Sequence, residues 1–479
     1  MVTSDRRKWP ALGLLSAVQF MVVLDIAIVN VALPSIKLDL GFSQENLQWV
    51  ISAYALVFGG FLLLGGRAAD LLGRKRIFLA GVVVFTVASF LAGMAWSEAS
   101  LIGARALQGL GAAIISPAAL SILSVTFREG RERNIALGVW GAVGGFGAAA
   151  GVLLGGVLTE TLSWSWIFFV NVPVGVAAFI LAPLLLSESR DASTKSFDVP
   201  GAVFVTAGLS TLVYAITQAG EHGWLAGRTI GFFAASLVLL VAFVGWEERH
   251  PEPLMRFGIF RTRTVTGANV AGFILGTAMF SMFLMLTLYM QQVLGYSAME
   301  TGVAYIAVAG TAILWSAVAA QLVTRIGVKP VLAVGMVALT AGLVLFTQVS
   351  VGGSYVTDLL PGFLLVGLGI GFAFVPISIA ALAGVQPAEA GLASGLINTS
   401  QQIGGALGIA ALSTIATSRT GDALAAGTAA PAALVDGFTA AFVAGAVIAA
   451  LGIAAALTLI RREELAAAPE AQPALDLAA

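Results

Sequence analysis

Long apolar segments alternate with short polar connections along nearly the whole chain. A helix that crosses a bilayer needs about 20 apolar residues. Fourteen segments are close to this length, and they cover residues 11–34, 46–66, 77–96, 99–122, 134–158, 166–186, 200–217, 229–247, 267–291, 301–322, 330–349, 355–378, 392–416 and 437–460. The pattern therefore predicts an all-α integral membrane protein with 14 transmembrane helices.

The composition agrees with a chain that is surrounded by lipid. Hydrophobic residues make up 59% of the sequence and charged residues only 10%, whereas a soluble protein carries about 25% charged residues. The net charge of −1 argues against a nucleic-acid partner. Because the chain has no cysteine and two histidines, thiolate metal sites are excluded and no cofactor is expected.

The basic residues predict the orientation in the membrane. With a cytoplasmic N-terminus, 20 of the 24 lysines and arginines fall in cytoplasmic segments, and Lys37, Arg228 and Arg419 fall outside. An excess of Lys and Arg marks cytoplasmic loops. We therefore expect both termini in the cytoplasm. The alanine- and glycine-rich, lysine-poor composition is typical of a GC-rich bacterial genome, which indicates a bacterial inner (cytoplasmic) membrane.

An internal repeat relates the first and the last six segments. "ERNIALG" (132–138) matches "EAGLASG" (389–395) at Glu, Ala and Gly, and "GLG" at Gly109 recurs at Gly367. Two related halves with a site between them are typical of transporters. We therefore expect the following division of the chain: a cytoplasmic N-terminal segment (1–10), a six-helix half (11–186), a linker with two inserted spans (187–247), a cytoplasmic loop (248–266), a second six-helix half (267–460) and a disordered cytoplasmic tail (461–479).

Several segments resemble motifs of the major facilitator superfamily. "GRAADLLGRKR" (66–76) resembles its loop 2–3 motif, "RALQGLGAA" (105–113) its span 4 motif, and "GAAAGVLLGG" (147–156) its span 5 antiporter motif. In the last of these, Val152 stands where the motif has proline. "LDIAIVNVALP" (24–34), "WSWIFFVNVP" (164–173) and "FDVPG" (197–201) are similar to the 14-span drug:proton antiporters.

The resemblance implies a major facilitator fold with two six-helix halves plus two inserted spans. It also implies proton-coupled efflux of amphipathic drugs or antibiotics by alternating access, in a monomer that has a small amphipathic substrate, protons and the lipid bilayer as its partners. A proton-coupled uptake symporter stays open, because Val152 replaces the motif proline. An exporter of lipid or of an envelope component is a further alternative. An enzyme is not expected, because the polar segments lack a catalytic set.

Three polar residues are predicted to lie at one depth within the membrane. Asp25 is nine residues before Pro34, at the outer end of the first span, which corresponds to about 13 Å. The same rise per residue puts Arg105 about 9 Å and Tyr54 about 12 Å below the outer surface. We therefore expect these side chains to share one layer.

A charge at the bilayer centre costs about 2.5–3.5 kcal/mol, so Asp25 and Arg105 are functional candidates. We interpret Asp25 as the proton carrier, because Arg105 stabilises the carboxylate when it is close and favours proton uptake when it is distant. A fixed structural ion pair and snorkelling at the lipid edge are the alternatives. The position that matches Arg105 in the second half is close to Phe363, so the fold itself does not require an arginine there.

Candidate substrate contacts are the polar residues within spans, since an amide without a partner is costly in hydrocarbon. They are Asn30, Tyr54, Gln108, Asn398, Gln401 and Gln402. The stretch 278–290 adds Met282 and Phe283, because methionine and aromatic side chains adapt to varied apolar ligands. Hydrogen bonds between helices are the alternative for the amides, and contact with lipid is the alternative for the Met–Phe stretch.

Two groups of residues are candidates for conformational gating. In the loop 2–3 motif they are Gly66, Asp70, Gly73, Arg74 and Lys75. Asp70 suits the positive end of a neighbouring helix or an arginine, and the basic residues suit acidic partners; a topological role alone is the alternative. In the span 5 motif they are Gly147, Gly151 and Gly155, which share one helix face and allow close packing. Generic packing is the alternative there.

Overall fold

The computed structural model describes residues 5–127, 131–190, 198–251, 253–255, 257–383, 385, 390–461 and 464. Within these residues all regular elements are helical. They are α1 (Asp5–Leu40), α2 (Gln44–Leu47), α3 (Trp49–Leu72), α4 (Arg74–Gly93), α5 (Glu98–Thr126), α6 (Arg131–Thr161), α7 (Trp166–Phe169), α8 (Asn171–Leu185), α9 (Val199–His222), α10 (Gly227–Glu247), the 3₁₀-helix η1 (Phe257–Arg261), α11 (Arg263–Gln292), α12 (Ala298–Ala304), α13 (Ile306–Ile326), α14 (Val328–Phe346), the π-helix η2 (Tyr355–Leu359), α15 (Leu360–Ala380), α16 (Ala390–Ala425) and α17 (Ala430–Leu459).

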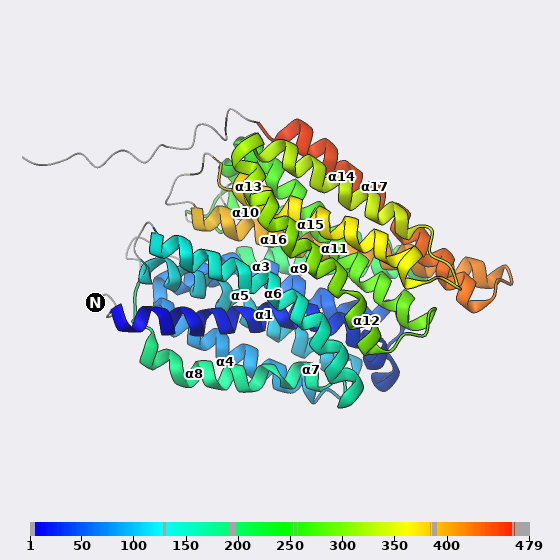
Figure 1. Ribbon diagram of the computed structural model, residues 1–479, viewed down its shortest axis with the longest axis horizontal. Coiled ribbons are helices and arrows are strands. Elements are labelled where there is room, and N and C mark those ends of the chain that lie inside the picture. The colour runs from blue at the N-terminus through cyan, green and yellow to red at the C-terminus, as the bar shows by residue number, and fades with distance from the viewer. Residues whose placement is uncertain are drawn as a thin grey trace, which may run out of the picture.

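The long helices run side by side along the long axis of the molecule (Figure 1). In the described residues, 12 helices are long and apolar enough to cross a membrane. Two further long helices, α6 and α16, overlap the two remaining predicted segments. The predicted all-α membrane fold is therefore confirmed. The expectation for the tail 461–479 falls outside the described residues, apart from residues 461 and 464.

The helices form two groups with the same packing pattern. In the first group, α1 packs against α6, and α5 lies between α3 and α4. In the second group, α11 packs against α16, and α15 lies between α13 and α14. The two groups lie one above the other in Figure 1. This matching is what the sequence repeat predicts.

Polar residues and glycines set the helix boundaries. Ser97 and Ser100 form a capping box at the start of α5, and Ser297 and Glu300 form one at the start of α12. The break between α3 and α4 falls on Gly73, whose φ of 111° favours glycine.

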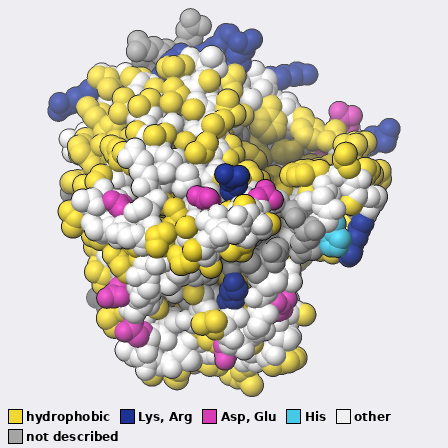
Figure 2. All heavy atoms as spheres, turned by 90° about the vertical axis from the view of Figure 1, so that its right-hand side faces the viewer, with side chains coloured by type: hydrophobic (Ala, Val, Ile, Leu, Met, Phe, Trp, Pro, Cys, Tyr) yellow, Lys and Arg dark blue, Asp and Glu magenta, His cyan; other side chains and the backbone are white. Residues whose placement is uncertain are grey.

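We name the two ends of the bundle by their helix ends. The proximal end contains the start of α1 and the junction of α3 with α4, and the distal end contains the end of α1 and the start of α3. Figure 2 looks at the distal end: hydrophobic side chains gather around the perimeter, and charged side chains are few and scattered. This surface suits a protein with lipid around its sides.

The two groups meet at the distal end. Gln291 at the end of α11 donates a hydrogen bond to the carbonyl oxygen of Val31 in α1 (2.9 Å). The amide of Met299 donates to Glu160 at the end of α6 (3.0 Å). A Cβ at Gly156 would lie 2.6 Å from the carbonyl oxygen of Ala298, so these backbones touch. The distal side of the interface is therefore closed in this structure.

The inserted helix α9 covers one seam between the groups. It packs against α3 of the first group and α16 of the second. Gln48 at the start of α3 donates to the hydroxyl of Thr217 in α9 (2.8 Å), and Thr414 in α16 donates to the carbonyl oxygen of Ile216 (3.3 Å). The insertion is thus bonded to both groups.

Candidate functional site

Asp25 of α1 and Arg105 of α5 form a buried ion pair inside the first group. The guanidinium Nη1 lies 2.5 Å from Asp25 Oδ2. Asp25 is 0% exposed and Arg105 is 1% exposed. The guanidinium also lies 4.4 Å from the centre of the Tyr54 ring. The predicted layer of these three residues is confirmed.

Arg105 also contacts α3, α7 and a neighbouring residue of its own helix. Its Nε donates to the carbonyl oxygen of Val50 in α3 (2.8 Å), and its Nη1 donates to Gln108 Oε1, one turn further along α5 (2.8 Å). The ring of Phe168 in α7 lies 5.7 Å from the guanidinium. These contacts fix the direction of the charge, because a guanidinium donates in one plane.

The carboxylate has three donors. Besides Arg105, its Oδ1 accepts from the amides of Gln108 (3.0 Å) and Asn171 (2.8 Å). Gln108 also donates to Ser89 Oγ in α4 (2.8 Å). One carboxylate therefore joins α1, α5 and α8, and through Gln108 it reaches α4.

Two members of this network, Asn171 and Ser89, were missed by the sequence reasoning. Asn171 is the first residue of α8 and lies in "WSWIFFVNVP", where an amide follows an apolar run. That amide was a usable signal, because a buried amide needs a partner. Ser89 carried no such signal, since a serine in a helix bonds to its own backbone, as Ser89 does to Phe85.

Glycines bring these helices close enough for the contacts. A Cβ at Gly109 would meet the backbone of Tyr54, and a Cβ at Gly111 would lie 2.7 Å from the amide nitrogen of Phe85. Close approach of α5 to α3 and α4 therefore depends on small residues at these positions. The site is as much a product of helix packing as of its polar side chains.

The gating candidates of the span 5 motif pack on the helix that carries Asp25. A Cβ at Gly147 would lie 3.2 Å from Val23 Cβ, and one at Gly151 would lie 2.8 Å from the carbonyl oxygen of Leu24. A Cβ at Gly155 would lie 2.6 Å from the carbonyl oxygen of Ile28. The predicted glycine face is confirmed as the contact between α6 and α1.

The loop 2–3 candidates form a short network at the proximal end. Arg74 binds Asp70 (2.9 Å), as expected. Glu188 accepts from the backbone amide of Lys75 (3.1 Å) and lies 3.8 Å from Arg76 Nε. The acidic partner therefore binds the start of α4 through the Lys75 amide and the Arg76 side chain. Gly66 lies against Pro117 of α5.

The predicted substrate contacts do not gather around one cavity in the described residues. Asn30 donates to carbonyl oxygens of its own helix, and Tyr54 and Gln108 belong to the Asp25 layer. Met282 is buried in the second group, where Phe283 packs on Tyr305 (4.9 Å). On α16, Asn398 is exposed, Gln401 is partly buried, and Gln402 lies against Gly59 of α3. Gln402 is thus at the boundary between the groups.

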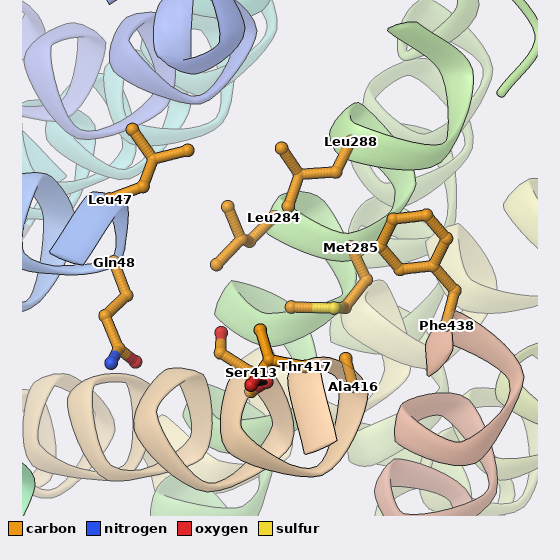
Figure 3. Close-up of a pocket in the computed structure, with 9 residues that line it drawn as sticks. All are labelled: Leu47, Gln48, Leu284, Met285, Leu288, Ser413, Ala416, Thr417 and Phe438. Atoms are coloured by element: carbon orange, nitrogen blue, oxygen red, sulfur yellow. Dashed lines mark hydrogen bonds between the residues drawn. The ribbon is translucent and has the colours of Figure 1, made fainter. Parts of the chain in front are cut away.

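A small cavity lies between the groups near the distal end. Figure 3 shows Leu47 and Gln48 of the first group facing side chains of α11, α16 and α17 across it. Its volume of about 10 Å³ is just enough for one water molecule. The distal gap is therefore too small for an organic substrate in this conformation.

The fold and the site define a class of protein: a multi-pass membrane transporter of two matched helix groups, with an ion-paired carboxylate buried in the first. The chain belongs to the Major Facilitator Superfamily, whose pattern it matches over residues 15–409. It is 42% identical to the puromycin resistance protein of Streptomyces alboniger over 90% of this chain and 86% of that protein. It is 39% identical to the cephamycin export protein of Amycolatopsis lactamdurans over 86% of this chain and 85% of that protein.

A solved structure shares the fold. It is the bacterial homologue of the human lysosomal transporter Spinster, in an inward-facing and unoccupied conformation. The TM-score is 0.67 with 16% sequence identity, over 95% of this chain and 98% of that chain.

Proposed function

We propose that this protein exports small amphipathic compounds, antibiotics among them, in exchange for protons, and that Asp25 takes up and releases the proton. The observation that carries the proposal is the buried Asp25–Arg105 pair with its amide donors from α5 and α8. The efflux direction is supported by the resistance and export proteins that it resembles.

Protonation of Asp25 changes the balance of charge in the layer. The proton neutralises the carboxylate and leaves the Arg105 guanidinium without its counter-ion. An unpaired buried charge costs about 3–5 kcal/mol, so the protonated state favours a conformation in which Arg105 is hydrated or moves away. A proton on one carboxyl group is thereby converted into relative motion of α1 and α5.

The helix α1 transmits this motion to the interface between the groups. Val31, which accepts the hydrogen bond from Gln291 of α11, is six residues beyond Asp25, or about 9 Å along the helix. A shift of α1 at Asp25 therefore loosens or tightens the distal contact. Export in exchange for entering protons follows if a proton taken up from the distal side favours closure of the distal end, and if substrate binding with loss of that proton favours its opening.

The same proposal sets the orientation and the energy source. The proximal end faces the cytoplasm of a bacterial cell, both termini are cytoplasmic, and the protein works as a monomer in the inner membrane. Each proton that enters gains about 2.3 kcal/mol per 100 mV of membrane potential. Export then needs no nucleotide and no bound cofactor.

The test uses proteoliposomes with an imposed pH gradient and puromycin or a lipophilic cation as the substrate. The parent protein is expected to accumulate substrate against its gradient, and an ionophore that dissipates the pH gradient is expected to abolish the accumulation. Asp25→Asn is expected to leave only passive exchange of substrate. Asp39→Asn is the matched control, because Asp39 lies on the same helix but outside the layer.

Three results would overturn the proposal. Accumulation in the same direction as the protons would indicate uptake by symport. Transport of a fluorescent phospholipid in place of these compounds would indicate a lipid exporter. Normal coupling in Asp25→Asn would show that the carboxylate is a structural partner of Arg105.

A further inference from the structure

Two buried carboxyl groups meet at the proximal end of the inserted pair, far along the chain from Asp25. Asp198, which caps α9, is 0% exposed, and Glu247, the last residue of α10, is 2% exposed. Asp198 Oδ1 accepts from the amide of Gly201 (2.9 Å) and the indole of Trp246 (2.6 Å). Glu247 Oε2 accepts from the amide of Met255 (2.9 Å). Each carboxyl group thus has one satisfied oxygen.

The other two oxygens, Asp198 Oδ2 and Glu247 Oε1, are buried without a donor. They converge over the Cα of Gly201: a Cβ there would lie 2.6 Å from Asp198 Oδ2 and would also touch Glu247 Oε1. Two ionised carboxylates only accept hydrogen bonds and repel each other, so this arrangement is favourable when one of them carries a proton.

Asp198 is the member that keeps the charge. Burial by itself raises the pKa of Asp198, but hydrogen bonds from Glu247, the Gly201 amide and Trp246, with the charge of His250, lower that pKa below its ordinary value. The shared proton is therefore carried by Glu247 and donated to Asp198 Oδ2.

We propose that Asp198 and Glu247 bind one proton between them, and that this proton fastens the inserted helices to the connection that enters the second group. Glu247 holds the amide of Met255, and Arg67 of α3 donates to the carbonyl oxygen of Pro253 (3.0 Å). The segment 253–255 then continues through η1 into α11. Loss of the proton to water leaves two facing carboxylates, and their repulsion frees this segment.

The charged groups around the pair do not replace the proton. His250 stacks on Trp246 (5.8 Å between ring centres) on the side of Asp198. Glu248 and Arg249 follow Glu247 on the exposed end of α10, Arg67 reaches the segment from α3, and Arg261 is exposed in η1. Among the described residues no lysine or arginine forms an ion pair with either carboxyl group. The contact is therefore present at acidic pH and is lost as the pH rises through the upper titration step of the pair.

The absence of cysteine from the 479-residue chain allows a direct test by introduced cysteines. Met255→Cys reports the segment through its rate of labelling by a maleimide in lipid nanodiscs. Gly352→Cys, at an exposed position with open space around it, corrects for ionisation of the thiol. We expect the labelling rate of Met255→Cys, divided by that of Gly352→Cys, to rise about tenfold from mildly acidic to mildly alkaline pH. A tenfold change corresponds to one pKa unit.

Substitutions then show whether the shared proton, and not another group, causes the pH dependence of the labelling ratio. Glu247→Gln keeps a donor facing Asp198, so its ratio is expected to stay low at every pH, whereas Glu247→Ala is expected to give a high ratio throughout. Glu248→Gln is the exposed neighbour and is expected to titrate like the parent. Asp198→Asn also supplies a permanent donor and an N-cap, so it replaces Glu247→Gln if that variant fails to fold.

Infrared spectroscopy gives a second readout of the same proton. The parent is expected to show the infrared band of a protonated carboxyl group at acidic pH. In Glu247→Gln the intensity of this band is expected to fall, because the contribution of Glu247 is missing. A ratio that is flat with pH in the parent would overturn the proposal. So would a Glu247→Gln variant that still titrates like the parent, or an infrared band unchanged by that substitution.

Discussion

Corresponding positions of the two helix groups hold charged side chains in the first group and aromatic side chains in the second. In the first group Arg105 pairs with Asp25 under Tyr54. Gly109 recurs as Gly367, 258 positions later, and the same offset carries Arg105 onto Phe363 and Asp25 onto Phe283. Both of these phenylalanines pack on Tyr305, at 5.5 Å and 4.9 Å between ring centres.

The difference separates what the fold requires from what the function requires. Both groups have the same helix packing, and the second has an aromatic cluster where the first has charges. Replacing a buried ion pair by well-packed apolar side chains is often neutral or stabilising. The proposed function assigns the charges of the first group to proton exchange, and the following variants test this assignment.

Removal of the arginine alone is expected to have the largest effect on stability. Arg105→Ala leaves the Asp25 carboxylate buried without a counter-ion, which lowers the free energy of unfolding by about 3–5 kcal/mol. Adding Asp25→Asn to this variant is expected to recover most of the lost free energy of unfolding. Thermal unfolding in detergent measures both. A single and a double variant with equal losses would show that packing of the arginine, and not its charge, is what matters.

Added bulk between helices is expected to cost about the same in both groups. Gly151→Ala brings a methyl group 2.8 Å from the carbonyl oxygen of Leu24, and Gly408→Ala brings one 2.7 Å from Thr277 Cγ2. Overpacking of this kind costs about 1–3 kcal/mol. Gly103→Ala is the control, because nothing lies within 4 Å of that position. A cost confined to Gly151 would point to a special role of the α1–α6 contact.

A change in the aromatic cluster is expected to affect stability but not coupling. Phe363→Leu removes ring contacts with Tyr305 and Phe346 and is expected to cost about 1 kcal/mol. The proton-driven accumulation ratio in proteoliposomes should equal that of the parent. A loss of coupling with normal folding would mean that the second group takes part in proton exchange.

The proximal ion pair is expected to have the smallest effect on stability. Arg74 and Asp70 lie on either side of the break between α3 and α4 and are partly exposed, and exposed ion pairs contribute about 0.2–1 kcal/mol. Arg74→Gln should therefore unfold almost like the parent while its transport rate falls. An unchanged rate would leave this motif with a topological role only.

The sequence predicts the Asp25 layer because depth within a helix is arithmetic. A rise of about 1.5 Å per residue places Asp25, Arg105 and Tyr54 together once the spans and their directions are known. The same arithmetic does not say which side chains on one level touch. Asn171 and Ser89 enter the network because of helix rotation and glycine-mediated approach, which are tertiary properties.

The predicted substrate contacts also show what residue type alone leaves undetermined. A buried amide indicates a need for a partner, but the partner can be the helix itself, as for Asn30, or a neighbouring helix, as for Gln108. The predicted span 166–186 likewise divides into α7 and α8, and that break makes Asn171 the first residue of a new helix. Residue type alone therefore identifies candidates without assigning their contacts.

The most direct test of the central claim is to count protons released when substrate binds. The purified protein in weakly buffered detergent solution is mixed with saturating substrate, and a pH indicator follows the release. We expect release of up to one proton per molecule by the parent and by Phe363→Leu, and none by Asp25→Asn that still binds substrate. Undiminished release by Asp25→Asn would show that Asp25 does not carry the exchanged proton.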